Sequence, residues 1–117
     1  MKSKWVTILI FVFIIAISYY AISINGHNMD DKFSKCLAEN STLYIQTGCF
    51  TCQKQEDLFG ENFKNLNVVN CAEEENYDVC FVTEQIQWTP TWIVRNEKYV
   101  GYKTFEELSE MTGCPLN

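Results

Sequence analysis

The N-terminal segment of the chain limits what the remainder can fold into. Residues 5–24 (WVTILIFVFIIAISYYAISI) contain no charged side chain over 20 consecutive positions, which is about the length that a helix needs to cross a bilayer. A cleavable signal peptide has an apolar core of only about 7–15 residues. We therefore expect an uncleaved transmembrane signal-anchor, with cleavage near Ala21 and Ser23 as the alternative. The 93 residues that follow suffice for one domain.

Charge predicts the orientation of this anchor. Lys2 and Lys4 precede the span, and because positive flanks stay in the cytoplasm, residues 1–4 are expected to be cytoplasmic. Residues 25–117 then lie on the far side, with seven Lys and Arg against fifteen Asp and Glu. So acidic a surface repels nucleic acid and anionic lipid headgroups. We expect no nucleic-acid partner, and contact with the membrane only through the N-terminal helix.

After a polar linker at residues 25–29, residues 30–117 predict one α/β domain. Helices are expected where apolar residues recur at helical spacing or where a capping box opens the segment, at 30–39, 49–59, 73–86 and 104–113. Strands are expected at the short apolar runs 42–46, 67–70, 91–95 and 98–102, the last two joined by a turn at 96–97. A strand–helix–strand unit implies a parallel pair and the hairpin adds antiparallel strands, which gives a mixed sheet flanked by helices. The core is expected to contain most of the domain's aromatic residues: Phe59, Phe63, Tyr77, Phe81, Trp92 and Phe105.

Two cysteines follow the first predicted strand, in the sequence TGCFTC of residues 47–52. At the first turn of a helix, unpaired N–H groups and the macrodipole favour negative charge. A Cys49 thiolate is therefore stabilised, and its pKa falls below the value of about 8.5 of a free thiol. Cys52 lies on the same helical face, where it can attack a mixed disulfide at Cys49. The motif predicts a redox couple with Cys49 as the attacking and Cys52 as the resolving cysteine.

Cys-x-x-Cys spacing also occurs in zinc knuckles and metal chaperones. Zinc would need two further ligands at comparable spacing, and the chain offers only His27 and scattered cysteines. We expect no metal and no organic cofactor. Two non-enzymatic alternatives stay open, a metal chaperone and a binding module whose Cys-x-x-Cys is an inert staple.

A second motif, Trp88-Thr89-Pro90, comes directly before the third predicted strand. The order of elements around both motifs resembles the thioredoxin fold, in which a cis-proline lies against the Cys-x-x-Cys pair. Thr89-Pro90 looks like this feature, and a cis bond before proline costs only about 0.5–1 kcal/mol. Trp88, Thr89 and Pro90 are therefore the expected substrate-binding segment, with Trp88 bordering the groove.

Residues 32–115 resemble the thioredoxin-like domain that is fused to, or partners, bacterial and plant vitamin K epoxide reductase homologues. The resemblance is carried by the Lys-Phe-x-x-Cys-Leu opening, Cys-x-x-Cys-Gln, Leu-Phe-Gly, a further cysteine pair and Pro-Thr-Trp. It implies that Cys49 attacks, Cys52 resolves and Pro90 is the cis-proline. It also implies that the domain oxidises exported proteins and exchanges disulfides with a membrane-embedded quinone reductase. That reductase would be a separate chain.

The chain departs from the family pattern in two respects. The family commonly has an aromatic residue before the first cysteine and Pro-His between the pair, where this chain has Gly48 and Phe50-Thr51. A histidine there would help to hold a thiolate, so its absence suggests a less oxidising couple. Potentials in the superfamily run from about −270 to about −120 mV. The alternative direction, a reductase of exported thiols as in cytochrome maturation, therefore stays open.

Four further cysteines fit two structural bridges in an oxidising compartment. The family carries an equivalent of Cys71 and Cys80, so the resemblance implies a bridge between them. The alternative is a relay pair that passes electrons between the Cys49/Cys52 couple and a partner. Cys36 and Cys114 are left to each other.

Overall fold

Secondary structure is described for residues 2–116 of the computed structural model, and side chains for residues 2–21 and 31–116. The first element is a single helix, α1 (Lys2–Asn40). It continues through residues 25–29, where we expected a linker, so the two predicted N-terminal helices form one element. This segment contains no proline, and its one glycine costs only about 1 kcal/mol in a helix interior. His27 lies outside the residues whose side chains are described.

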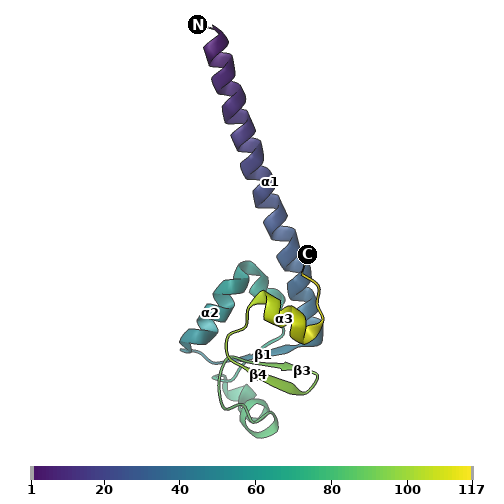
Figure 1. Ribbon diagram of the computed structural model, residues 1–117. Coiled ribbons are helices and arrows are strands. Elements are labelled where there is room, and N and C mark those ends of the chain that lie inside the picture. The colour runs from purple at the N-terminus through teal and green to yellow at the C-terminus, as the bar shows by residue number, and fades with distance from the viewer. Residues whose placement is uncertain (1, 117) are drawn as a thin grey trace.

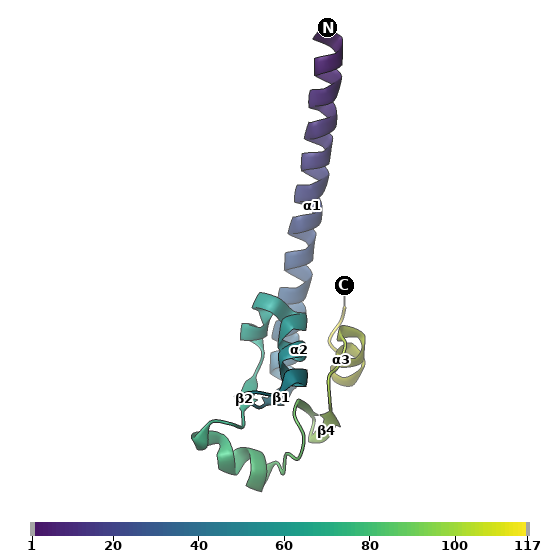
Figure 2. The ribbon, with the colours of Figure 1, turned by 90° about the vertical axis from the view of Figure 1, so that its left-hand side faces the viewer.

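The N-terminal half of α1 projects away from the rest of the chain (Figures 1 and 2). Its segment Lys2–Ala21, of 20 residues, is long and apolar enough to cross a membrane, and none of it is buried. The predicted span of residues 5–24 therefore coincides with an exposed apolar helix as far as Ala21. A helix of this length and composition is shared by membrane anchors and signal sequences.

The four strands form one mixed sheet in the order β2-β1-β3-β4. Its strands are β1 (Thr42–Ile45), β2 (Val68–Asn70), β3 (Thr91–Val94) and β4 (Glu97–Val100). β1 pairs in parallel with β2 and antiparallel with β3, and β3 pairs antiparallel with β4. The predicted mixed sheet is thus present in the structure.

The hairpin turn between β3 and β4 lies one residue earlier than predicted, at Arg95-Asn96 instead of 96–97. Both residues have positive φ, 51° and 67°. Positive φ at both central positions is the geometry of the two-residue turn whose twist matches that of the flanking strands. Asparagine tolerates this region better than most residues, which favours the shorter turn.

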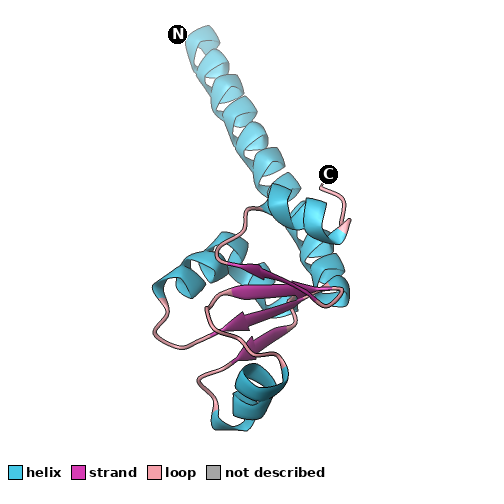
Figure 3. Cartoon of the chain, turned by 60° about the horizontal axis from the view of Figure 1, so that its bottom comes forward, coloured by secondary structure: helices cyan, strands magenta, loops and turns pink. Residues whose placement is uncertain are grey.

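Three α-helices cover one face of the sheet, and the short helical segment of residues 74–83 covers the other (Figures 2 and 3). The last part of α1, with α2 (Phe50–Phe59) and α3 (Phe105–Thr112), lies on the first face. The main core is on this side and is made of Phe33, Leu37, Leu43, Phe59, Leu66, Trp92, Leu108 and Cys114. A smaller cluster of Tyr44, Cys71, Cys80 and Ile86 fills the second face. Successive strand residues point to opposite faces, so Leu43 and Tyr44 of β1 enter different clusters.

The segment after β2 differs from prediction. Instead of one helix over 73–86, the chain forms the 3₁₀ turn η2 (Glu74–Asn76) and the π-helical segment η3 (Asp78–Thr83). The Cys71–Cys80 disulfide ties the ends of this short loop together. The Glu84 N–H accordingly bonds to the Val79 carbonyl, five residues back, at 2.9 Å. A continuous α-helix would carry Cys80 away from Cys71.

This change of structure also corrects the expected core. Tyr77 is 58% exposed and Phe81 38% exposed, and their rings lie 5.0 Å apart, against each other. Only Cys80 and Ile86 of this segment point inward. The prediction that Tyr77 and Phe81 belong to the core was therefore wrong, whereas Phe59 and Trp92 are buried and Phe63 and Phe105 pack against the main core.

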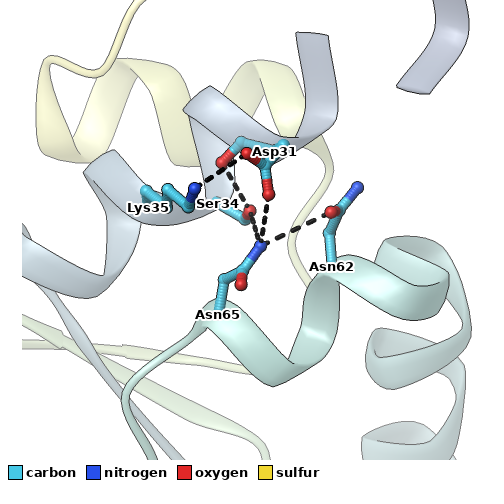
Figure 4. A network of polar contacts seen from close by, with 5 residues as sticks. All are labelled: Asp31, Ser34, Lys35, Asn62 and Asn65. Carbon is cyan, nitrogen blue, oxygen red and sulfur yellow. Dashed lines mark hydrogen bonds and ion pairs between the residues drawn. The ribbon is translucent and has the colours of Figure 1, made fainter. Parts of the chain in front are cut away.

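A polar network fixes the last turns of α1 to η1 (Gly60–Asn65), a 3₁₀ segment where we expected a loop. The Asn65 amide donates to Asp31 Oδ1 at 2.9 Å, to Ser34 Oγ at 3.1 Å and to Asn62 Oδ1 at 3.4 Å (Figure 4). Asp31 also pairs with Lys35 at 2.9 Å. The helix predicted over 30–39 would place Asp31 in its first turn. Asp31 lies instead far inside α1, and its carboxylate helps to dock that helix.

Two disulfides are present, Cys36–Cys114 and Cys71–Cys80, which are the two pairs expected from the sequence. The first joins α1 to the chain beyond α3. The predicted capping box of α3 is also confirmed, with the Thr104 side chain accepting the Glu107 N–H and the Glu107 side chain accepting the Thr104 N–H.

Candidate thiol site

The turn between β1 and α2 places Cys49 at the start of the helix. Gly48 has φ +85°, a conformation that side-chain-bearing residues rarely adopt. The Cys49 N–H donates to the Gln46 carbonyl at 3.1 Å and closes the turn. Cys49 is then the N-cap of α2, with φ −82° and ψ 115°. We expected Cys49 in the first helical turn, and it lies one position before that turn.

The side chain of Cys49 contacts two parts of the chain. Its Sγ accepts the Cys52 N–H at 3.2 Å, as an N-cap side chain does. Its thiol also lies 3.4 Å from the Thr89 carbonyl oxygen, to which it donates. Cys49 is half-buried, Cys52 is only 4% exposed, and both are free thiols. The structure thus brings together three of the predicted site residues from two separate motifs.

The surroundings of the two thiols shift their pKa values in opposite directions. Burial raises the pKa of Cys49, but hydrogen bonds from the Cys52 and Thr89 side chains and from the backbone N–H groups of Cys52 and Thr51 outweigh it. The net pKa of Cys49 is lowered. For Cys52, burial is the main cause of a raised pKa, and the hydrogen bond with Cys49 adds to it. Cys49 is therefore the thiol that ionises first.

The loop that carries Thr89 is held from both sides. The Thr89–Pro90 bond is cis, as expected, and the Pro90 side chain is fully buried. The Thr91 hydroxyl donates to the Trp88 carbonyl, and the Gly101 N–H donates to the Pro90 carbonyl at 2.8 Å. These contacts fix the Thr89 carbonyl that faces Cys49.

A hollow of about 200 Å³ opens beside the two cysteines. Its lining includes Gln46, Thr47, Glu56 and Asn70, and the Asn70 amide donates to the Thr47 hydroxyl at 2.9 Å. The walls near the thiols are therefore largely polar.

Trp88 lies outside this hollow. It is 70% exposed and lines a neighbouring hollow of about 240 Å³ with Gln85, Ile86, Lys98 and Val100. The sequence places Trp88 next to Thr89 but does not show in which direction the Trp88 ring points. Phe50, between the two cysteines, is also exposed, at 85%.

Gln55 is a buried residue of this region that sequence reasoning missed. It is fully buried and hydrogen-bonded to Trp92 and Lys103. The signal was present, because Cys52, Gln55 and Phe59 recur at the spacing of one helical face. A polar residue on the inward face of a helix indicates a specific hydrogen-bonding role.

The residues at this site have the parts that thiol–disulfide exchange requires, a half-buried acidic thiol and a buried second thiol three residues on. Among the residues whose side chains are described, no three His, Cys, Asp or Glu side chains gather as metal ligands would. The chain matches no known protein-family model.

Proposed function

We propose that this chain is a membrane-anchored thiol–disulfide oxidoreductase of thioredoxin-like fold that acts on exported proteins. One observation carries the proposal. The free Cys49 thiol, at the N-cap of α2, accepts the Cys52 N–H at 3.2 Å and lies 3.4 Å from the Thr89 carbonyl, with the free Cys52 buried behind it. An inert staple would not need an acidic, accessible thiol.

The exchange takes place in two balanced steps. The Cys49 thiolate attacks one sulfur of a substrate disulfide, so that a Cys49–substrate disulfide forms and the second substrate sulfur leaves as a thiolate that takes up a proton. Cys52 then loses its proton and attacks the Cys49 sulfur, which forms the Cys49–Cys52 disulfide and releases the first substrate sulfur. The substrate gains two electrons and the cysteine pair loses two. Run in reverse, the same steps oxidise a substrate dithiol.

The arrangement of the elements supports the thioredoxin-like fold. A parallel β1–α2–β2 unit is followed by the antiparallel pair β3–β4 and by α3, and the loop before β3 lies against the Cys-x-x-Cys turn. The exposed apolar helix, the two lysines at its N-terminal end and the two disulfides support anchoring with the domain outside the cytoplasm.

Repeated oxidation of substrates needs an acceptor that removes two electrons from the reduced pair. We assign this role to a membrane-embedded quinone-linked reductase of the vitamin K epoxide reductase type, a separate chain. The resemblance of residues 32–115 to the domain that partners such reductases supports the assignment.

The test is the redox equilibrium of the full chain in detergent against glutathione, with Cys49 and Cys52 trapped by alkylation and counted by mass. A potential of about −130 to −200 mV supports an oxidase or isomerase. A value near about −270 mV makes the protein a reductase of exported thiols. The absence of any reversible couple contradicts the proposal.

A matched control separates this couple from the disulfides. The Cys49→Ser/Cys52→Ser variant keeps Cys36–Cys114 and Cys71–Cys80 and must show no exchange in this window. The same two proteins are titrated with copper and zinc. Stoichiometric binding that depends on the pair, without reduction of insulin, would identify a metal chaperone instead.

A further inference from the structure

Gln55 is a buried polar side chain that the exchange steps do not use. It is fully buried, one helical turn after Cys52 on the inward face of α2. A buried amide is unfavourable unless its hydrogen bonds are satisfied. Its partners therefore identify the parts of the chain that it holds together.

The Gln55 amide binds two segments outside its own helix. Its Nε2 donates to the Lys103 carbonyl at 3.0 Å, and its Oε1 accepts the Lys103 N–H at 2.8 Å. The same Oε1 accepts the indole Nε1–H of Trp92 at 3.2 Å. Lys103 is in the loop between β4 and α3, and Trp92 is in β3.

Both segments lead to the loop that faces Cys49. Trp92 follows Pro90 by two residues, at the start of β3. Gly101 precedes Lys103 by two residues, and its N–H donates to the Pro90 carbonyl at 2.8 Å. Two short paths therefore connect Gln55 on the cysteine-bearing helix to the residue that follows Thr89.

We propose that Gln55 is a positioning residue for thiol–disulfide exchange. It holds the start of α2 at a fixed separation from the 88–90 loop, so that Cys49 stays in contact with Thr89. That Gln55 matters for exchange rests on the function proposed above. That Gln55 positions the Cys49 sulfur does not depend on that function. The competing interpretation is that Gln55 only stabilises the core.

The test is Gln55→Met in the full chain in detergent. Methionine is similar in size but has no amide, so all three hydrogen bonds are lost. The readout is the pH midpoint of Cys49 alkylation in the reduced protein. We expect the midpoint to shift by about one pH unit, because Gln55→Met frees Thr89, whose carbonyl accepts the Cys49 thiol at 3.4 Å and whose side chain helps to lower the pKa of Cys49.

Two further variants separate positioning from stability. Thr112→Val removes a buried hydroxyl that donates to the Leu108 carbonyl at 2.6 Å and accepts the Cys114 N–H at 3.2 Å. It should lower the thermal midpoint and leave the alkylation midpoint unchanged. Trp92→Phe deletes the indole hydrogen bond to Gln55 and also shrinks a buried core ring that packs against Phe59. It should lower the thermal midpoint as well, and should shift the alkylation midpoint in the same direction as Gln55→Met by a smaller amount.

The inference is overturned if Gln55→Met and Trp92→Phe lower the thermal midpoint, as Thr112→Val does, without moving the alkylation midpoint. If Gln55→Met does not fold, Trp92→Phe decides by itself. Failure of the proposed function is a different result. It is the absence of a reversible couple in the unmodified chain, and the alkylation midpoint of Cys49 is measured without reference to that couple.

Discussion

At the scale of single residues, the acidity of Cys49 gives a pH dependence with a definite sign. Hydrogen bonds that favour the thiolate outweigh burial, so the pKa of Cys49 lies below its ordinary value. Alkylation of the reduced chain should therefore be faster than that of a free cysteine at the same pH below about 8.5, and should slow as pH falls through that lowered pKa. Its half-maximal rate is expected below about pH 8.5, and a midpoint at or above that value would contradict the site.

Replacing either cysteine of the pair tests the acidity of these thiols further. Cys52→Ala removes the thiol whose hydrogen bond lowers the pKa of Cys49, so the Cys49 midpoint should rise. The same variant cannot resolve a mixed disulfide, and should accumulate a covalent adduct with a model disulfide substrate that is visible by mass. In Cys49→Ser, the remaining Cys52 thiol is buried, and its alkylation midpoint should lie above about pH 8.5.

Part of this site could be predicted from the sequence. Cys49 and Cys52 follow from their spacing after a strand, and the resemblance to the thioredoxin fold implied the cis bond before Pro90. The distance between Cys49 and Thr89 could not be predicted, because it depends on how two segments 40 residues apart pack. The role of Gln55 was missed for a related reason, since its partners Trp92 and Lys103 are also distant in sequence.

At the scale of elements, removing the Cys71–Cys80 disulfide tests whether this bridge is structural or a relay pair. Cys71 and Cys80 are both buried, at 4% and 0% exposed. The Cys71→Ser/Cys80→Ser variant should lose about 2.5–3 kcal/mol of unfolding free energy, as expected for closing a loop of nine residues. Urea denaturation measures this loss. Exchange by Cys49 should be unchanged, and loss of exchange without loss of stability would indicate a relay pair.

The Cys36→Ser/Cys114→Ser variant is the matched comparison. These cysteines are 78 positions apart, so removing their bridge should cost more unfolding free energy, about 4–5 kcal/mol.

The 71–80 loop explains why the helix predicted over 73–86 is absent. Helical spacing over 73–86 predicted a regular helix, but the disulfide and the inward Ile86 impose 3₁₀ and π turns instead. A covalent constraint of this kind leaves no periodic trace in the sequence.

At the scale of the whole molecule, whether the apolar part of α1 is retained distinguishes a membrane anchor from a cleaved signal sequence. We expect the protein to stay in the membrane fraction after alkaline carbonate extraction, with the intact mass of the 117-residue chain. Mass spectrometry of the extracted protein measures this. A product that starts after Ala21 or Ser23 would show that the segment is a cleaved signal sequence.

The continuity of α1 has a mechanical consequence. One helix runs from Lys2 to Asn40, and its last residues, from 31 onward, pack in the domain core. The part before them is about 44 Å long at about 1.5 Å per residue and continues into the domain without a break. Under the proposed anchoring, a tilt of this helix in the bilayer would move the thiol site with it. Inserting one residue at 25–28 would rotate the domain by about 100° around the helix axis, so the length of this segment would set which side of the domain the proposed membrane-embedded partner meets.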